Sequence, residues 1–172
     1  MRQLVLITTG GTIEKTYDEM TGTLENRVSI VGRMMEGLRL EETAVRTVDL
    51  MSKDSLYMTD ADRERIVEAT VAALADPKTS AVVILHGTDT LCVTGELLET
   101  RLAKPLARPV VLTGAMRPFE MVRSDALQNL TEAVFATGVL GAGVYCVAHG
   151  RALRFPGVVK DRARGTFVGR RE

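Results

Sequence analysis

The chain has few cysteines and histidines. Among its 172 residues only Cys92, Cys146, His86 and His149 belong to these two types. Both cysteines lie in apolar surroundings without a partner spacing, which predicts buried thiols in a reducing compartment and no disulfide framework. Because no cysteine pair has ligand spacing and only two histidines are available, we expect neither a bound metal nor a cofactor.

The chain also lacks an excess of either charge sign and any long apolar run. Lys+Arg and Asp+Glu both number 22, so no overall field favours nucleic acid, a membrane surface or an acidic partner. No apolar run approaches transmembrane length, and the apolar residues after Arg2 are too few for a signal peptide. The expected location is therefore the cytoplasm. The basic residues near the end of the chain predict a solvated tail: Arg162, Arg164, Arg170 and Arg171.

Two groups of sequence motifs are absent. Neither Gly-x-x-x-x-Gly-Lys nor Gly-x-Gly-x-x-Gly follows the first predicted strand, which disfavours nucleotide binding. No Gly-x-Ser-x-Gly elbow accompanies His86, so we interpret this histidine as a group that orients the backbone and not as part of a serine-hydrolase triad.

Along the chain, short apolar runs typical of strands alternate with patterns typical of helices. Strands are expected over residues 4–7, 43–50, 81–85, 109–112 and 143–148. Helices are expected over residues 28–38, 60–75, 91–102 and 125–137. Thr59 and Ser124 are the predicted N-caps, and Gly138 is expected to follow the last helix. Residues 14–26 are predicted to be a loop and residues 149–172 to be irregular.

This alternation predicts one domain of the α/β class, covering residues 1–172. Its sheet would be open and mostly parallel with helices on both faces, a three-layer arrangement of the Rossmann-like or flavodoxin-like kind. Four strands end in polar, glycine-containing segments: Thr9–Thr12, Ser52–Ser55, His86–Thr90 and Thr113–Arg117. These ends share one edge of a parallel sheet, where ligands bind. A helix that begins after Thr90 would add a dipole favouring anionic groups.

The strand-end motifs resemble a known family. Thr9-Gly10-Gly11-Thr12-Ile13 and His86-Gly87-Thr88-Asp89-Thr90 resemble the two signature motifs of the bacterial-type L-asparaginases. The segment Thr113–Pro118, and Ser124-Asp125 followed by Asn129-Leu130, resemble further stretches of that family in the same order and spacing. The resemblance covers nearly the whole chain.

The resemblance implies roles for particular residues. Thr12 matches the family's primary nucleophile, and Thr88, Asp89 and Lys160 match its second catalytic group. Tyr17 matches the loop tyrosine that assists the nucleophile. The family's aspartate at Asp89 also holds the substrate's α-amino group, and Ser52 matches the serine that binds its α-carboxylate. The residues implied to surround the substrate are Gly11, Ser52, Lys53, Gly87, Thr88, Asp89 and Ala115.

The implied reaction is hydrolysis of L-asparagine to aspartate and ammonia in two steps. Thr12 would form an acyl ester as ammonia leaves, and water would then release aspartate. A threonine hydroxyl needs a neighbour that takes its proton or lowers its pKa, which Lys160 could do for Thr88 and Tyr17 for Thr12. The backbone N–H groups of Gly11 and Thr88 are the candidate donors to the oxyanion.

The chain also departs from the family pattern. Family members run nearly twice this length and have a C-terminal domain that completes a neighbouring site, so we expect a short form without that domain. Such a form is expected to be a homo-oligomer, with loop 14–26 and Tyr17 closing over the site. Lys53 and Ala126 stand where the family usually has a neutral polar residue and a glycine.

Other functions stay open on the sequence alone. The same chemistry could act on glutamine, or the chain could be the amidase subunit of a tRNA amidotransferase. A non-enzymatic alternative is an amino-acid-binding or regulatory module, which the complete set of Thr12, Thr88, Asp89 and Lys160 disfavours.

Overall fold

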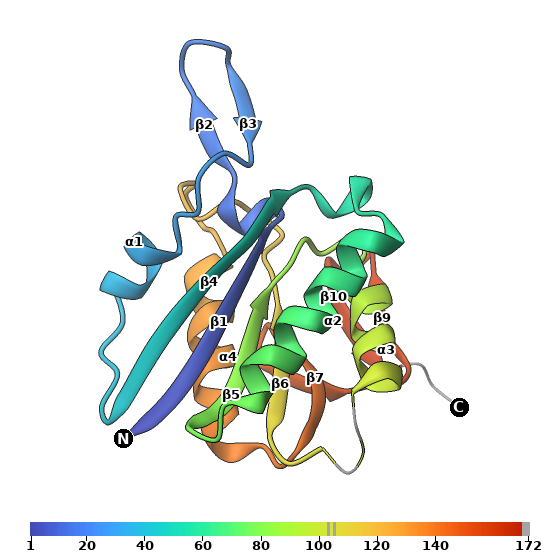
Figure 1. Ribbon diagram of the computed structural model, residues 1–172. Helices are drawn as coiled ribbons and strands as arrows, with labels where there is room; N and C mark the ends of the chain where they lie inside the picture. The colour runs from blue at the N-terminus through green and yellow to red at the C-terminus, as the bar shows by residue number, and fades with distance from the viewer. Residues whose placement is uncertain (103, 105, 170–172) are drawn as a thin grey trace.

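A six-stranded sheet forms the centre of the molecule (Figure 1). The structure is a computed structural model that describes residues 1–102, 104 and 106–169. Arg170 and Arg171 of the predicted basic tail lie outside the described residues. The order across the sheet is β4 (Thr43–Lys53), β1 (Arg2–Gly10), β5 (Thr79–Leu85), β6 (Pro109–Thr113), β7 (Gly143–Ala148) and β8 (Arg151–Arg154). The first five strands are parallel, and β8 runs antiparallel to β7.

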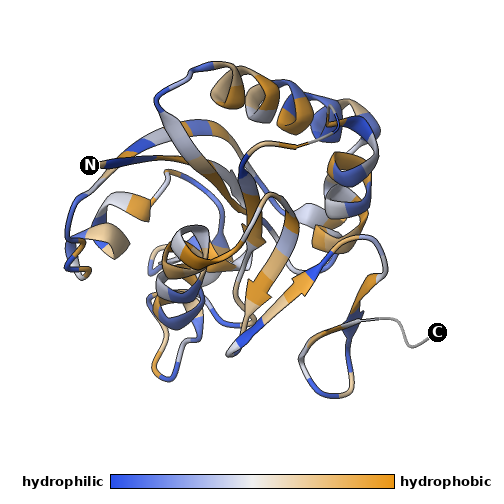
Figure 2. Ribbon diagram, turned by 90° about the horizontal axis from the view of Figure 1, so that it is seen from below, coloured by the Kyte–Doolittle hydropathy of each residue, from blue (hydrophilic) through white to orange (hydrophobic). Residues whose placement is uncertain are grey.

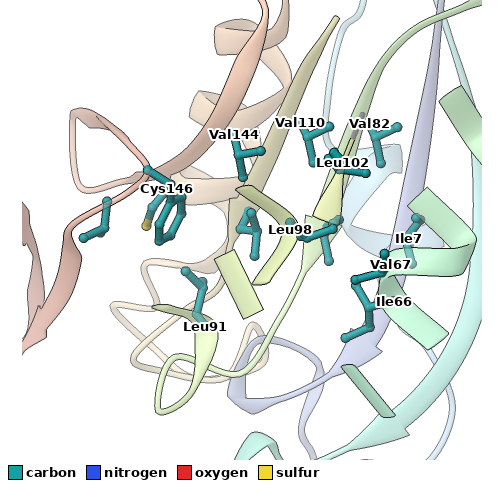
Figure 3. Close-up of a cluster of buried hydrophobic side chains, with 14 of the residues drawn as sticks. Ile7, Ile66, Val67, Val82, Leu91, Leu98, Leu102, Val110, Val144 and Cys146 are labelled. Atoms are coloured by element: carbon teal, nitrogen blue, oxygen red, sulfur yellow. The ribbon is translucent and has the colours of Figure 1, made fainter. Parts of the chain in front are cut away.

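Helices cover both faces of this sheet, which confirms the predicted three-layer α/β fold. The α-helices among the described residues are α1 (Val31–Glu36), α2 (Asp60–Ala75), α3 (Leu91–Arg101) and α4 (Ala126–Val139). Alternate residues of each strand point to opposite faces. Ile7 and Val82 therefore pack with α2 and α3, whereas Leu6 and Val83 pack with α1 and α4. Figure 3 shows the first of these two cores. Viewed from below, hydrophobic stretches of the strands lie between the helices (Figure 2).

Strand β1 is positioned by neighbours on both sides. Ile7 lies opposite Val48 of β4 and Ile84 of β5, and residues 4–10 are buried. The sequence ends this strand in Gly10 and Gly11, so the chain leaves the sheet at its carboxyl edge. A strand buried on both faces and both edges gives a rigid base for the turn that follows it.

The helices agree with the predicted ones except at some ends. Thr59 caps α2 through a capping box with Asp62, as predicted. Helix α1 is shorter than the predicted 28–38 at both ends: it begins at Val31, and Gly37 closes it after Glu36. Helix α4 begins after Asp125 and not after Ser124, and it continues to Val139, so Gly138 lies within the helix and does not follow it.

Two segments predicted to be irregular contain strands. Residues 14–26 include the hairpin of β2 (Thr16–Asp18) and β3 (Thr23–Glu25), which projects from the body of the molecule (Figure 1). After β8, the chain forms an antiparallel ribbon of β9 (Val158–Asp161) and β10 (Thr166–Gly169). Phe155 and Phe167 anchor this last part in the core, at 1% and 2% exposure.

The two thiols differ in environment. Cys146 is buried in the core, and burial raises the pKa of its thiol. Cys92 on α3 is only half-buried, which corrects the prediction that both are buried, and desolvation raises the pKa of its thiol to about 11. Within the described residues, no helix has the length and apolar character that crossing a bilayer requires.

Candidate functional site

The carboxyl ends of the central strands meet around Gly87. The N–H of Gly11 donates to the carbonyl of Lys53 at the end of β4, at 2.9 Å. On the other side, the N–H of His86 donates to the carbonyl of Thr113 at the end of β6, at 2.8 Å. These backbone bonds continue the sheet into the loops, and they bring the four polar strand-end segments to one place.

Gly11 and Gly87 pack with their backbones in direct contact. Gly11 has a φ of 80°, and a Cβ built on it would lie only 2.4 Å from the Cα and N of Gly87. A Cβ on Gly87 would in turn lie 2.4 Å from the Oγ of Ser55. Only residues without a side chain permit this approach. Because Thr12 and Thr88 each follow one of these glycines, the contact draws both threonines to the same edge of the sheet.

Lys160 joins the second threonine to a carboxylate. Its Nζ donates to the Oγ1 of Thr88 at 2.8 Å and to the Oδ1 of Asp89 at 2.9 Å. The hydrogen bond from Lys160 lowers the pKa of the Asp89 carboxyl, and Arg162 lowers it further. Thr88 is buried at 4% exposure. An ammonium that donates to a buried hydroxyl oxygen stabilises the alkoxide form of that threonine.

Arg162 contacts this cluster, although most of its side chain is exposed as predicted. Its Nη1 donates to the Oδ1 of Asp89 at 3.0 Å, a contact that the prediction of a solvated tail did not include. The ribbon β9–β10 carries both Lys160 and Arg162 to the mouth of the sheet. Sequence reasoning missed Arg162 because the segment showed no strand pattern that would place it beside Lys160.

Thr12 opens a short 3₁₀ helix, η1 (Thr12–Glu14), directly after β1. Its side chain is half-buried, and among the described residues no hydrogen bond holds its hydroxyl. The turn around it is firmly held. Asn26 donates to the carbonyl of Gly11 at 2.7 Å, and the buried Glu14 accepts from the N–H of Gly10 at 3.1 Å. Burial raises the pKa of Glu14. The backbone beside Thr12 is thus fixed while its hydroxyl stays available.

Tyr17 does not lie with the threonines. It is on β2 of the projecting hairpin, opposite Leu24, with 60% of its surface exposed. Its N–H donates to the Oε2 of Glu120 at 3.1 Å. The sequence predicted that this segment closes over the site, whereas the structure shows the hairpin extended from the body (Figure 1).

The other residues predicted to surround the substrate, such as Ser52, Lys53 and Ala115, lie in separate surroundings. Ser52 is exposed and lines a groove of about 280 Å³ together with Thr8 and Asp49. The Nζ of Lys53 pairs with the Oδ2 of Asp62 at 2.6 Å, and this bond lowers the pKa of that carboxyl to about 2. Ala115 is buried at the end of β6, at 1% exposure.

The sequence matches a family model over most of its length. The model is that of the N-terminal domain of asparaginase, and it matches residues 3–166. The chain belongs to the asparaginase family. The fold and the strand-end motifs described above agree with this assignment.

Similar proteins in this family carry two kinds of name. A glutamyl-tRNA(Gln) amidotransferase subunit of Methanopyrus kandleri is 36% identical over 153 residues, which are 84% of this chain and 32% of that protein. The L-asparaginase of Thermococcus kodakarensis is 34% identical over 133 residues, 77% of this chain and 39% of that protein. The solved structure of the thermostable L-asparaginase from Thermococcus kodakarensis superposes with a TM-score of 0.87 at 29% identity. The superposition covers 97% of this chain and 51% of the solved chain. This chain therefore spans about a third to a half of the length of these relatives.

Ser55 is a buried serine at the candidate site that sequence reasoning did not single out. Its side chain is 1% exposed, packs against Gly87, and has an Oγ without a hydrogen-bond partner among the described residues. Strand β4 continues to Lys53, so Ser52 is still within the strand and Ser55 is the serine beyond its end. The signal in the sequence was Asp54, whose side chain accepts from the N–H of Leu56 and begins the helix η2 (Ser55–Tyr57).

A second polar network holds the third asparaginase-like stretch. Asp125 accepts from the N–H groups of Met116 and Arg117, and from the Nε2 of His149 at 2.7 Å. Burial opposes its ionisation, yet these donors lower the pKa of the Asp125 carboxyl overall. Asn129 adds a bond to the carbonyl of Gly114 at 2.8 Å. The Asp125–Asn129 pair therefore fixes the loop after β6.

His86 orients the backbone, as the sequence indicated. The side chain is fully buried, with Nδ1 at 2.8 Å from the carbonyl of Gly87 and Nε2 at 2.8 Å from the Oγ1 of Thr94. Burial lowers the pKa of His86 to about 4. The neutral ring thus ties the loop carrying Thr88 to helix α3.

We predict that the chain loses stability in mild acid because of His86. Between pH 6.5 and 4 the unfolded chain binds a proton that folded His86 does not, so stability falls as the pH falls. The loss is a few kcal/mol at most. Urea unfolding at several pH values should show a smaller loss in His86→Gln than in the wild type or in the His149→Gln control. Equal losses in all three proteins would contradict the prediction.

Proposed function

We propose that this asparaginase-family chain hydrolyses the side-chain amide of L-asparagine to aspartate and ammonia. One observation carries the proposal: the Lys160 ammonium holds the hydroxyl of Thr88 and the carboxylate of Asp89 together. The contact between Gly11 and Gly87 supports it by bringing Thr12 to the same edge of the sheet. A hydroxyl nucleophile and a second hydroxyl beside a cation can together carry a two-step acyl transfer.

In the first proposed step the Oγ1 of Thr12 attacks the amide carbonyl. The N–H groups of Gly11 and Thr88 stabilise the oxyanion that forms. The amide C–N bond then breaks, and the nitrogen takes up the proton released by Thr12. Ammonia departs, and an ester between the acyl group and Thr12 remains. In the second step water attacks the ester on the side of Thr88 and Lys160. The C–O bond to Thr12 breaks, which regenerates its hydroxyl and releases aspartate.

Ser55 is proposed to bind the substrate carboxylate in place of Ser52. Its buried Oγ has no partner in the described part of the chain, and such a group is costly unless something fills the position. Helix α3 begins next to it, and its N-terminal dipole favours an anion. Tyr17 is also proposed to assist Thr12, which requires the β2–β3 hairpin to fold toward the site when substrate binds.

A second candidate function is the amidase subunit of a tRNA amidotransferase. The 36% identity to the amidotransferase subunit of Methanopyrus kandleri favours it. Such a subunit would show little ammonia release from free amides and would need a partner. For either function we propose a cytoplasmic location and a homo-oligomer, because the sequence carries no disulfide pattern and α4 exposes Phe135 and Val139.

The test is ammonia release from asparagine and from glutamine by the purified chain. We expect release from asparagine, and a fall in kcat of about 10²- to 10³-fold in Lys160→Met because the Thr88 alkoxide loses its cation. Lys78→Met is the matched control, since Lys78 is exposed at the opposite edge of the sheet. No release from either amide would overturn the proposal and favour the second candidate, whereas release from glutamine alone would overturn it in favour of a glutaminase.

A further inference from the structure

An apolar surface lies open on the outer side of α4. Phe135 and Val139 stand one turn apart on this helix, with 68% and 63% of their surfaces exposed. Next to them a groove of about 250 Å³ runs between α4 and β8, and its lining includes Ala136, Leu140 and Ala152. We call these five residues the α4–β8 strip. A contiguous exposed apolar patch of this kind is typical of an interaction site.

The position of β8 leaves the strip uncovered. β8 is the last strand of the sheet. Its Leu153 packs against the core on the α3 side, where Phe167 anchors the ribbon β9–β10. Ala152, the residue before, points to the opposite face and lines the groove beside α4. In the part of the chain that the structure describes, the ribbon thus covers one face of β8 and nothing covers Phe135 on the other.

The two ends of the strip carry opposite charges. At one end Glu132 of α4 accepts from the N–H of Gly150 at 2.8 Å, just before β8 begins. At the other end Arg154, the last residue of β8, lies beside Ala142, soon after α4 ends. Its guanidinium is 5.8 Å from the centre of the Tyr145 ring. Among the described residues, both charged groups contact only neutral partners.

The neighbouring arginines keep this asymmetry. Arg151 lies near the acidic end, but its Nη1 turns to the ribbon and donates to the carbonyl of Phe167 at 3.1 Å. Arg2 donates to the hydroxyl of Thr137 near the end of α4, so it adds positive charge to the basic end. The strip is therefore acidic at one end and basic at the other.

Such a strip is complementary to a second copy of itself. If two copies meet with their strips antiparallel, about a two-fold axis, Glu132 of each copy faces the partner's Arg154. The exposed ring of Phe135 then packs in the partner's groove, and each contact occurs twice. Placing the strips parallel would set like charges against each other at both ends, which is unfavourable.

We propose that two copies of this chain associate through the α4–β8 strip, in an antiparallel contact that pairs Glu132 with the partner's Arg154. The inference names the interface of the proposed homo-oligomer and does not depend on the proposed amide hydrolysis. The strip contains none of the proposed catalytic residues, so each copy keeps its own set.

Sedimentation of the purified chain over a range of concentrations tests the interface. We expect a dimer. Phe135→Glu places a carboxylate in the apolar strip and should raise the dissociation constant of the dimer at least about 100-fold. Val71→Glu is the matched control, because Val71 is a 49% exposed apolar residue of α2, on the opposite face of the sheet. A monomeric wild type, or a dimer that survives Phe135→Glu, would overturn the inference.

Charge reversal tests the antiparallel arrangement. Glu132→Arg and Arg154→Glu should each weaken the dimer about 10-fold, because like charges then face each other at both ends. A mixture of the two variants should form mixed dimers with nearly the wild-type affinity, since every facing pair is again opposite in sign. Failure of the two variants to prefer each other over themselves would exclude this contact. These measurements use no substrate, so the interface and the proposed hydrolysis can fail separately.

Discussion

Replacing Thr12 by alanine should abolish amide hydrolysis while leaving the fold intact. The hydroxyl of Thr12 is the proposed nucleophile, so kcat should fall by at least about 10³-fold. Stability should hardly change, because no hydrogen bond in the described residues depends on that hydroxyl. Ammonia release and urea unfolding measure the two effects separately. Thr12→Ser keeps a hydroxyl and should retain measurable turnover.

Thr88→Ala should reduce kcat as well, but for a different reason. It removes the oxygen that accepts from Lys160 at 2.8 Å, so Lys160 then contacts Asp89 alone. If both threonines serve one reaction path, the double variant should be no slower than the slower single variant. Thr131→Ala, at an exposed position of α4, is the control for both. Near-normal turnover in the double variant would rule out the proposed two-step displacement.

The part of the site that could be predicted lies where strong local patterns end. β1, β5 and β6 are largely apolar and buried on both faces, and each stops at a glycine-containing segment. Such runs are recognisable without knowledge of tertiary contacts. The meeting of Thr12, Thr88 and Asp89 at one edge therefore follows from the parallel order of these strands.

The rest depends on contacts between distant segments. Strands β9 and β10 have four residues each and are mostly half-exposed, so their side-chain pattern is too short to detect. The position of Arg162 beside Asp89 could not be inferred without that ribbon. Ser55 was missed for a related reason, because β4 continues beyond its predicted end at Leu50, to Lys53. The hairpin carrying Tyr17 has little apolar surface to bury, so its direction is not encoded by hydrophobic pattern.

Replacing Gly11 by alanine should unfold the site and cost at least about 3 kcal/mol of stability. Two effects add at this position. A φ of 80° is unfavourable for any residue with a side chain, and the new Cβ would lie 2.4 Å from the backbone of Gly87. Because backbone cannot move aside as a flexible side chain can, the two strand-end loops would have to separate. Thr12 and Thr88 would then no longer share one edge, and turnover should be lost with stability.

Gly22 provides a control that separates the two effects. It has a φ of 69° in the hairpin, but a Cβ built there would meet nothing within 4 Å. Gly22→Ala should therefore cost only about 1 kcal/mol, the cost of the backbone conformation. The difference between the two variants, measured by urea unfolding, reports the contact between Gly11 and Gly87. Similar losses in both would mean that this contact does not hold the two threonines together, and the site would have to be organised by the Lys160 cluster alone.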